Sequence, residues 1–232
     1  MRTNSDSNRK RKNYRVSFLV LPIAFFIIGY LVFYLALTPV LEPVKNIYAL
    51  TFSNVNAITT DGSQGKDMFS EKDKADETEI IKASEIHFPY VGDKWGELTV
   101  ESIGISEMPL IYGDSTENLL RGACMSEKSR LPGYGSGTLV AAHNYNYFHE
   151  LQNIKEGAEV KVDTYYGSFV YRVYKAEIID VYQSKSYWND VYGDKETLVL
   201  YTCYPNNALR STHYRFFAFC EKISGPQIDE YA

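Results

Sequence analysis

The chain has 232 residues, enough for one sizeable domain with attached segments. Its hydrophobic content of 45% and aromatic content of 15% suit a packed core, and its 20 tyrosines favour a β-rich fold. A net charge of −5 gives no reason to expect binding to nucleic acid, which favours concentrated basic surface. The three cysteines are an odd number, so at least one thiol stays outside any disulfide.

The N-terminal part of the chain is typical of a membrane anchor. Residues 16–41 contain no charged side chain, and this stretch exceeds the roughly 20 residues that a membrane-spanning helix needs. Basic residues precede it and are opposed only by one acid: Arg2, Arg9, Lys10, Arg11, Lys12 and Arg15 against Asp6. The positive-inside rule therefore predicts a cytoplasmic tail at 1–15, a single-pass anchor at 16–41 and an extracellular remainder.

A cleaved signal peptide is the alternative for this segment. Its apolar region normally runs only about 7–15 residues before a small-residue cleavage site, and Ala36-Leu-Thr38 is a poor site of that kind. We therefore expect an uncleaved anchor. Residues 42–84 are polar, charged and turn-rich, which predicts a tether that spaces the folded domain from the bilayer.

From residue 85 to residue 224, short β-type runs alternate with turn signals, and residues 225–232 form a polar tail. The expected strands are 96–103, 109–112, 137–143, 159–164, 167–179, 197–202 and 215–223. Short helices are expected at 116–122 and 147–153. Seven or eight short strands with so little helix predict an all-β fold, in the form of a closed or nearly closed β-barrel.

Three of these runs each deliver a chemically active side chain to a strand end. One run ends at Cys203, a second delivers His143, and Arg215 opens a third. A thiol, an imidazole and a guanidinium at the edges of separate strands are typical of a cysteine active site. Of the other cysteines, Cys220 lies in an apolar run and is expected to be buried and inert, while Cys124 is undecided.

Both partners of the cysteine have competitors. The other histidines are His87, His149 and His213. His213, in the loop beside Cys203, is the most credible rival to His143. Arg210 is nearer to Cys203 than Arg215 in sequence but sits in a loop, and a strand holds a side chain more precisely than a loop does. His143 and Arg215 are therefore preferred.

The sequence around these residues resembles the sortases, the cysteine transpeptidases of Gram-positive cell surfaces. Leu200-Tyr-Thr-Cys203 fits their L-x-T-C signature, and Leu139-Val-Ala-Ala-His-Asn144 is similar to their histidine strand. Leu131-Pro-Gly133 and Lys155-Glu-Gly-Ala-Glu-Val160 also match the family pattern. The resemblance covers about residues 90–224, and the cytoplasm-in anchor agrees with it.

The class within this family is indicated by what the sequence lacks. The pilus-polymerising class usually carries an Asp-Pro-aromatic lid and a second C-terminal membrane helix. This sequence has no Asp-Pro pair, and its last residues, 227–232, are mostly polar. The chain most resembles the class A and class D housekeeping-type enzymes, and Cys203-Tyr-Pro205 leans towards class D.

The chemistry expected of these residues is acyl transfer through a thioester. Cys203 attacks a peptide carbonyl as thiolate, His143 protonates the departing amine, and Arg215 stabilises the oxyanion. The resemblance implies that the substrate is an LPxTG-like sorting signal and that the acceptor amine belongs to a peptidoglycan cross-bridge.

The loop before the cysteine strand corresponds to the family's substrate-facing loop. Within it, Tyr187 and Trp188 either pack against the sorting signal or cover the barrel end, and both readings stay open. The acidic residues nearby, Asp190, Asp194 and Glu196, lack the ligand spacing of an EF-hand. We therefore expect no required metal and no cofactor.

Three further functions fit parts of the pattern. The same chemistry could serve pilin polymerisation or plain proteolysis, which differ in product: isopeptide-linked multimers in the first case, a free acid in the second. A non-enzymatic surface binding module that keeps the barrel is the third reading. It predicts that the Cys203 thiol is no more reactive than those of Cys124 and Cys220.

Overall fold

The structure, a computed structural model, describes residues 20–36, 67–71, 80–206 and 212–231. The chain divides into two units, Met1–Tyr48 and Ala49–Ala232, and each is described by itself. In the first unit, residues 20–36 form one helix with almost all of its side chains exposed. In the described part of the chain, no helix is both long and apolar enough to cross a membrane. Residues 16–19 and 37–41 of the predicted anchor lie outside the described residues.

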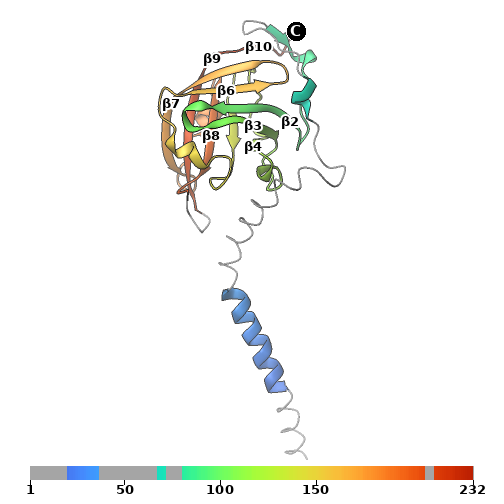
Figure 1. The fold of residues 1–232 in the computed structure, drawn as a ribbon, viewed down its shortest axis with the longest axis vertical. Coiled ribbons are helices and arrows are strands. Elements are labelled where there is room, and N and C mark those ends of the chain that lie inside the picture. The colour runs from blue at the N-terminus through green and yellow to red at the C-terminus, as the bar shows by residue number, and fades with distance from the viewer. Residues whose placement is uncertain (1–19, 37–66, 72–79, 207–211, 232) are drawn as a thin grey trace, which may run out of the picture. The chain divides into compact units, whose positions relative to one another are not determined.

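The second unit is built on a β-barrel (Figure 1). Its strands are β1 (Ile80–Lys82), β2 (Lys94–Val100), β3 (Ile105–Tyr112), β4 (Ala123–Met125), β5 (Thr138–Ala141), β6 (Glu159–Thr164), β7 (Ser168–Asp180), β8 (Thr197–Cys203), β9 (Tyr214–Ser224) and β10 (Gln227–Asp229). Strands β2 to β9 close in the order β2-β3-β4-β5-β8-β9-β7-β6. This confirms the predicted closed barrel of seven to eight strands.

In the described part of this unit, helical structure consists of single turns. They are η1 (Met68–Glu71), η2 (Ala83–Glu85), η3 (Glu101–Ile103), η4 (Asn118–Leu120), η5 (His149–Asn153) and α2 (Trp188–Val191). The helices expected at 116–122 and 147–153 correspond to η4 and η5, both shorter than predicted. Strand β4 was not predicted, because three residues are too few to show a period.

The folded part extends beyond the predicted limits of 85 and 224. Strand β1 lies in the segment expected to be tether, β10 lies in the expected tail, and the two pair in parallel. Ile81 of β1 and Ile228 of β10 are both buried in the main core. A three-residue strand with one buried isoleucine cannot be distinguished from a polar linker by its sequence.

Strands β5, β8 and β9 are buried on both faces of the sheet. In β8, Leu198 and Leu200 point into the barrel core, whereas Val199 joins a second apolar cluster on the other face. That outer cluster consists of Leu139, Ile179, Val191, Val199, Phe217 and Phe219. Burial on both faces explains why the sequence of these strands reads as unbroken apolar runs and not as alternation.

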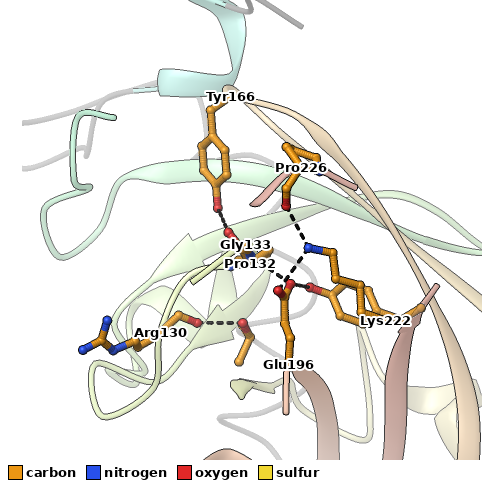
Figure 2. A network of polar contacts seen from close by, with 9 residues as sticks. Arg130, Pro132, Gly133, Tyr166, Glu196, Lys222 and Pro226 are labelled. Carbon is orange, nitrogen blue, oxygen red and sulfur yellow. Dashed lines mark hydrogen bonds and ion pairs between the residues drawn. The ribbon is translucent and has the colours of Figure 1, made fainter. Parts of the chain in front are cut away.

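A buried ion pair joins the beginnings of β5 and β8 to the end of β9 (Figure 2). The Glu196 carboxylate, just before β8, lies 3.0 Å from Lys222 Nζ and accepts hydrogen bonds from Gly133 N (2.8 Å) and the Tyr171 hydroxyl (3.0 Å). Lys222 also donates to the Pro226 carbonyl at 2.7 Å. Both charges are largely buried, so each depends on the other for compensation.

Replacing Lys222 by Met should therefore lower the free energy of unfolding by about 3 kcal/mol, because the Glu196 carboxylate would stay buried without its cation. Chemical denaturation of the purified domain measures this loss. The matched control is Glu159→Gln, which breaks the exposed Arg172–Glu159 pair and should cost less than about 1 kcal/mol. Equal losses in the two variants would contradict this account of the buried pair.

Candidate active site

Strand β8 lies between β5 and β9, and its hydrogen-bonding register sets which residues face one another. The pairing of β8 with β9 is antiparallel and puts Cys203 directly opposite Arg215. Residues opposite each other on neighbouring strands have their side chains on the same face of the sheet. Cys203 and Arg215 are thus neighbours on one face.

The pairing of β5 with β8 is parallel, with Ala141 opposite Tyr201. Beyond it, Ala142 N donates to the Tyr201 carbonyl at 3.3 Å, and the Thr202 hydroxyl donates to the Ala142 carbonyl at 2.7 Å. His143, predicted to end this strand, lies two residues after β5 ends at Ala141, and extending the register by those two residues would set it level with Cys203. Adjacent strands lie about 4.8 Å apart, so the extended register would bring the three predicted residues to the same end of β5, β8 and β9.

A groove of about 630 Å³ opens on the outer face of these strands. Leu139, Tyr201 and Phe217 lie along it on β5, β8 and β9, and Arg215 also lines it. Since Arg215 faces Cys203 across the β8–β9 pair, the groove reaches the cysteine end of the sheet.

Tyr187 and Trp188, at the start of α2, line the same groove. The Tyr187 ring stacks on Phe217 at 4.8 Å, and Trp188 stacks on Tyr192 at 5.1 Å. Both side chains are only partly buried. They therefore pack on the sheet and still present aromatic surface to the groove.

Accessibility separates the three cysteines, all of which are free thiols. Cys124 and Cys220 are buried, as expected of Cys220, whereas Cys203 is partly exposed. Burial raises the pKa of Cys124 to about 12 and raises that of Cys220 well above its ordinary value. Neither buried thiol forms a thiolate near neutral pH, which leaves Cys203 as the accessible nucleophile.

The His143 imidazole is partly buried, and this desolvation lowers the pKa of His143 from its usual 6.5. The ring is therefore uncharged at neutral pH and able to take a proton. The ring of Tyr145 stacks on it, with centroids 4.7 Å apart and planes 18° from parallel. The pKa of Tyr145 is raised by burial and, secondarily, by the nearby Cys203 sulfur.

The Arg215 guanidinium is held by the backbone of the residues just before it. Its Nη1 donates to the Thr212 carbonyl at 2.5 Å and to the Tyr214 carbonyl at 2.9 Å. A guanidinium carries five N–H donors in a fixed fork, so donors remain for a group in the groove. Arg210, the alternative arginine, lies outside the described residues.

The other histidines make contacts of their own. His213 Nε2 lies 3.4 Å from the Asp180 carboxylate, and its ring stacks on Tyr182 at 5.5 Å. His149 Nδ1 lies 3.0 Å from the Asn144 carbonyl, and His87 is exposed. His213 and His149 thus have partners of their own, whereas Tyr145, which stacks on His143, lies near Cys203.

Sequence reasoning assigned no role to Asn144, which joins the histidine and cysteine segments. Its side chain is buried, at 7% exposure, and its Nδ2 donates to the Pro205 carbonyl at 3.0 Å and to the Asn206 carbonyl at 3.2 Å. These bonds tie the residue after His143 to the turn after Cys203. The sequence feature that could have indicated this role is a polar residue that follows an apolar strand.

Within the described residues, no group of three or more His, Cys, Asp or Glu side chains could hold a metal ion. Two of the acids that the sequence places near the loop before β8 have partners of their own. Glu196 pairs with Lys222, and Asp190 accepts a hydrogen bond from the Tyr174 hydroxyl at 2.5 Å.

Comparison with known proteins gives one consistent family. The model of the sortase domain matches residues 98–223, more than half of the chain. Sortase D of Bacillus subtilis (strain 168) is 23% identical over 136 residues, which cover 59% of this chain and 67% of that protein. This similarity is consistent with the lean towards class D.

Solved sortase structures share the fold. Sortase C1 of Streptococcus agalactiae is 20% identical, with a TM-score of 0.51 over 78% of this chain and 86% of that one. Clostridium perfringens sortase C with the C-terminal cell wall sorting motif is 22% identical, with a TM-score of 0.51 over 58% and 72% of the two chains. At these sequence identities the similarity shows a shared barrel fold and no detail of the site or substrate.

Proposed function

The chain belongs to the sortase family of cysteine transpeptidases, and we propose that it joins proteins bearing an LPxTG-like sorting signal to an amine of the peptidoglycan cross-bridge. The observation that carries this proposal is the pairing of Cys203 with Arg215, which lines an aromatic groove, while His143 follows the neighbouring strand β5. A sorting signal lying in the groove would bring its scissile carbonyl to the one accessible thiol in the described part of the chain.

In the first step, the Cys203 thiolate attacks the carbonyl carbon of the scissile peptide bond. His143 takes the thiol proton and delivers it to the departing amine as the tetrahedral intermediate collapses to a thioester. The lowered pKa of His143 supports this role, because a neutral imidazole accepts a proton and the resulting acid readily gives it up.

Arg215 stabilises the charge that develops on the carbonyl oxygen during this step. Its guanidinium is permanently charged and faces Cys203 from β9. The loss of one such donor typically costs about 10²–10³ in turnover. In the second step, the acceptor amine attacks the thioester carbonyl, His143 takes a proton from this amine, and the Cys203 thiolate leaves.

Tyr187 and Trp188 contact the apolar part of the sorting signal in this account. Their place in the lining of the groove favours substrate contact, while the stacking of Tyr187 on Phe217 also supports a packing role. The two roles are compatible, because a ring fixed by packing on one face binds a substrate with its other face at low entropic cost.

Membrane anchoring is the remaining part of the proposal. The uncharged residues 16–41 would span the bilayer, with the basic residues of 1–15 in the cytoplasm and the barrel outside the cell. This topology would hold the enzyme at the surface where sorting-signal proteins and peptidoglycan meet.

The direct test of the proposed reaction is an assay with a sorting-signal peptide and an amine nucleophile. Wild-type protein should form the joined product, and Cys203→Ala should form none, because the thioester requires the sulfur. Mass analysis of products separates joining from release of a free acid and from linked multimers. Joined product from Cys203→Ala would rule the proposal out.

The arginine assignment has a separate test in the same assay. Arg215→Ala should lower turnover about 10²–10³-fold, since an oxyanion donor is lost, whereas Arg210→Ala should stay close to wild type. Arg215→Lys is the informative third variant: it keeps the charge but loses the forked donors and should recover only part of the rate. The reverse order, with Arg210→Ala the more damaging, would transfer the role to Arg210.

A further inference from the structure

We propose that Tyr145 is a positioning residue that holds the His143 imidazole in place beside Cys203. Its role in turnover rests on the proposed transpeptidation, but the contact itself does not. The two rings are nearly parallel, with centroids 4.7 Å apart. Aromatic stacking of this kind favours one orientation of the ring over others.

A histidine that moves protons is usually oriented by a hydrogen bond to its second ring nitrogen, as an aspartate does in serine proteases. Across the described ranges of this chain, neither ring nitrogen of His143 has a hydrogen-bond partner. The stacked Tyr145 ring is therefore the aromatic contact that fixes the plane of the imidazole. It covers one face of the ring and so contributes to the desolvation of His143.

The segment that carries Tyr145 is itself held against the cysteine turn. Asn144, between the two stacked residues, donates to the Pro205 and Asn206 carbonyls. The backbone on the far side is also fixed, because Phe148 N donates to the His143 carbonyl at 3.0 Å. The backbone that carries Tyr145 is therefore fixed relative to the Cys203 end of β8. Such support is needed if the Tyr145 ring is to position the imidazole precisely.

The ring of Tyr145 makes the stack on His143, and its hydroxyl takes no part in it, so substitutions can test the two groups separately. Tyr145→Phe keeps the stack and should retain turnover within about twofold. Tyr145→Ala removes the stack, and a histidine displaced by about 1 Å is expected to lower kcat on the order of 10²-fold, with little change in KM for the sorting peptide. Tyr145→Leu keeps apolar volume without an aromatic face and should lose activity like Tyr145→Ala, which guards against a simple folding defect.

A second readout does not depend on the substrate. NMR titration of the His143 ring protons, assigned with His143→Asn, should show a midpoint below 6.5 in wild type and in Tyr145→Phe. In Tyr145→Ala the exposed ring is hydrated, so the midpoint should rise towards 6.5. Cys203 on β8 and Arg215 on β9, the ionisable groups at the nearby strand ends, are the same in all variants.

The matched control is Tyr182→Ala, which removes a tyrosine–histidine stack of similar geometry, 5.5 Å and 18°, on His213. It should change neither kcat nor the His143 midpoint. The proposal is overturned if Tyr145→Ala keeps wild-type kcat and midpoint, or if Tyr145→Phe loses as much as Tyr145→Ala. If wild-type protein forms no joined product, the proposed function fails, and the titration still decides the role of Tyr145.

Discussion

The hydrogen-bonding register of β8 with its two neighbours is the constraint on which the site depends. The parallel pairing with β5 and the antiparallel pairing with β9 bring together side chains that are far apart in the sequence. Because side chains alternate along a strand, a slip of one residue in either pairing would turn the affected side chain to the opposite face. The geometry of the thiol, imidazole and guanidinium is therefore a property of the barrel.

Both ends of this three-strand unit are fixed by polar contacts. At one end, the buried Glu196–Lys222 pair joins the loop at Gly133 to β8 and β9. At the other end, Asn144 joins the histidine segment to the turn that follows Cys203. Between these contacts the strands are buried on both faces, which leaves little freedom for the register to shift.

The sequence was informative where burial on both faces produced long apolar runs. Those runs predicted β5, β8 and β9, and the number of runs predicted the barrel, although β5 ends at Ala141, two residues before His143. Strands β1, β4 and β10 have three residues each, too few for a periodic signal. The sequence did not predict the roles of Asn144 and Tyr145. Asn144 contacts the turn after Cys203, and Tyr145 contacts the His143 ring, and no local sequence pattern predicts such contacts.

The central claim is that Cys203 carries the acyl group between the two substrates, and trapping that intermediate tests it most directly. Wild-type protein would be mixed with the sorting-signal peptide in the absence of an amine, quenched in acid, digested and analysed by mass spectrometry. The account predicts that the fragment containing Cys203 gains the mass of the acyl portion and loses it on treatment with hydroxylamine. Turnover of the peptide with the acyl group on another residue, or on none, would contradict it.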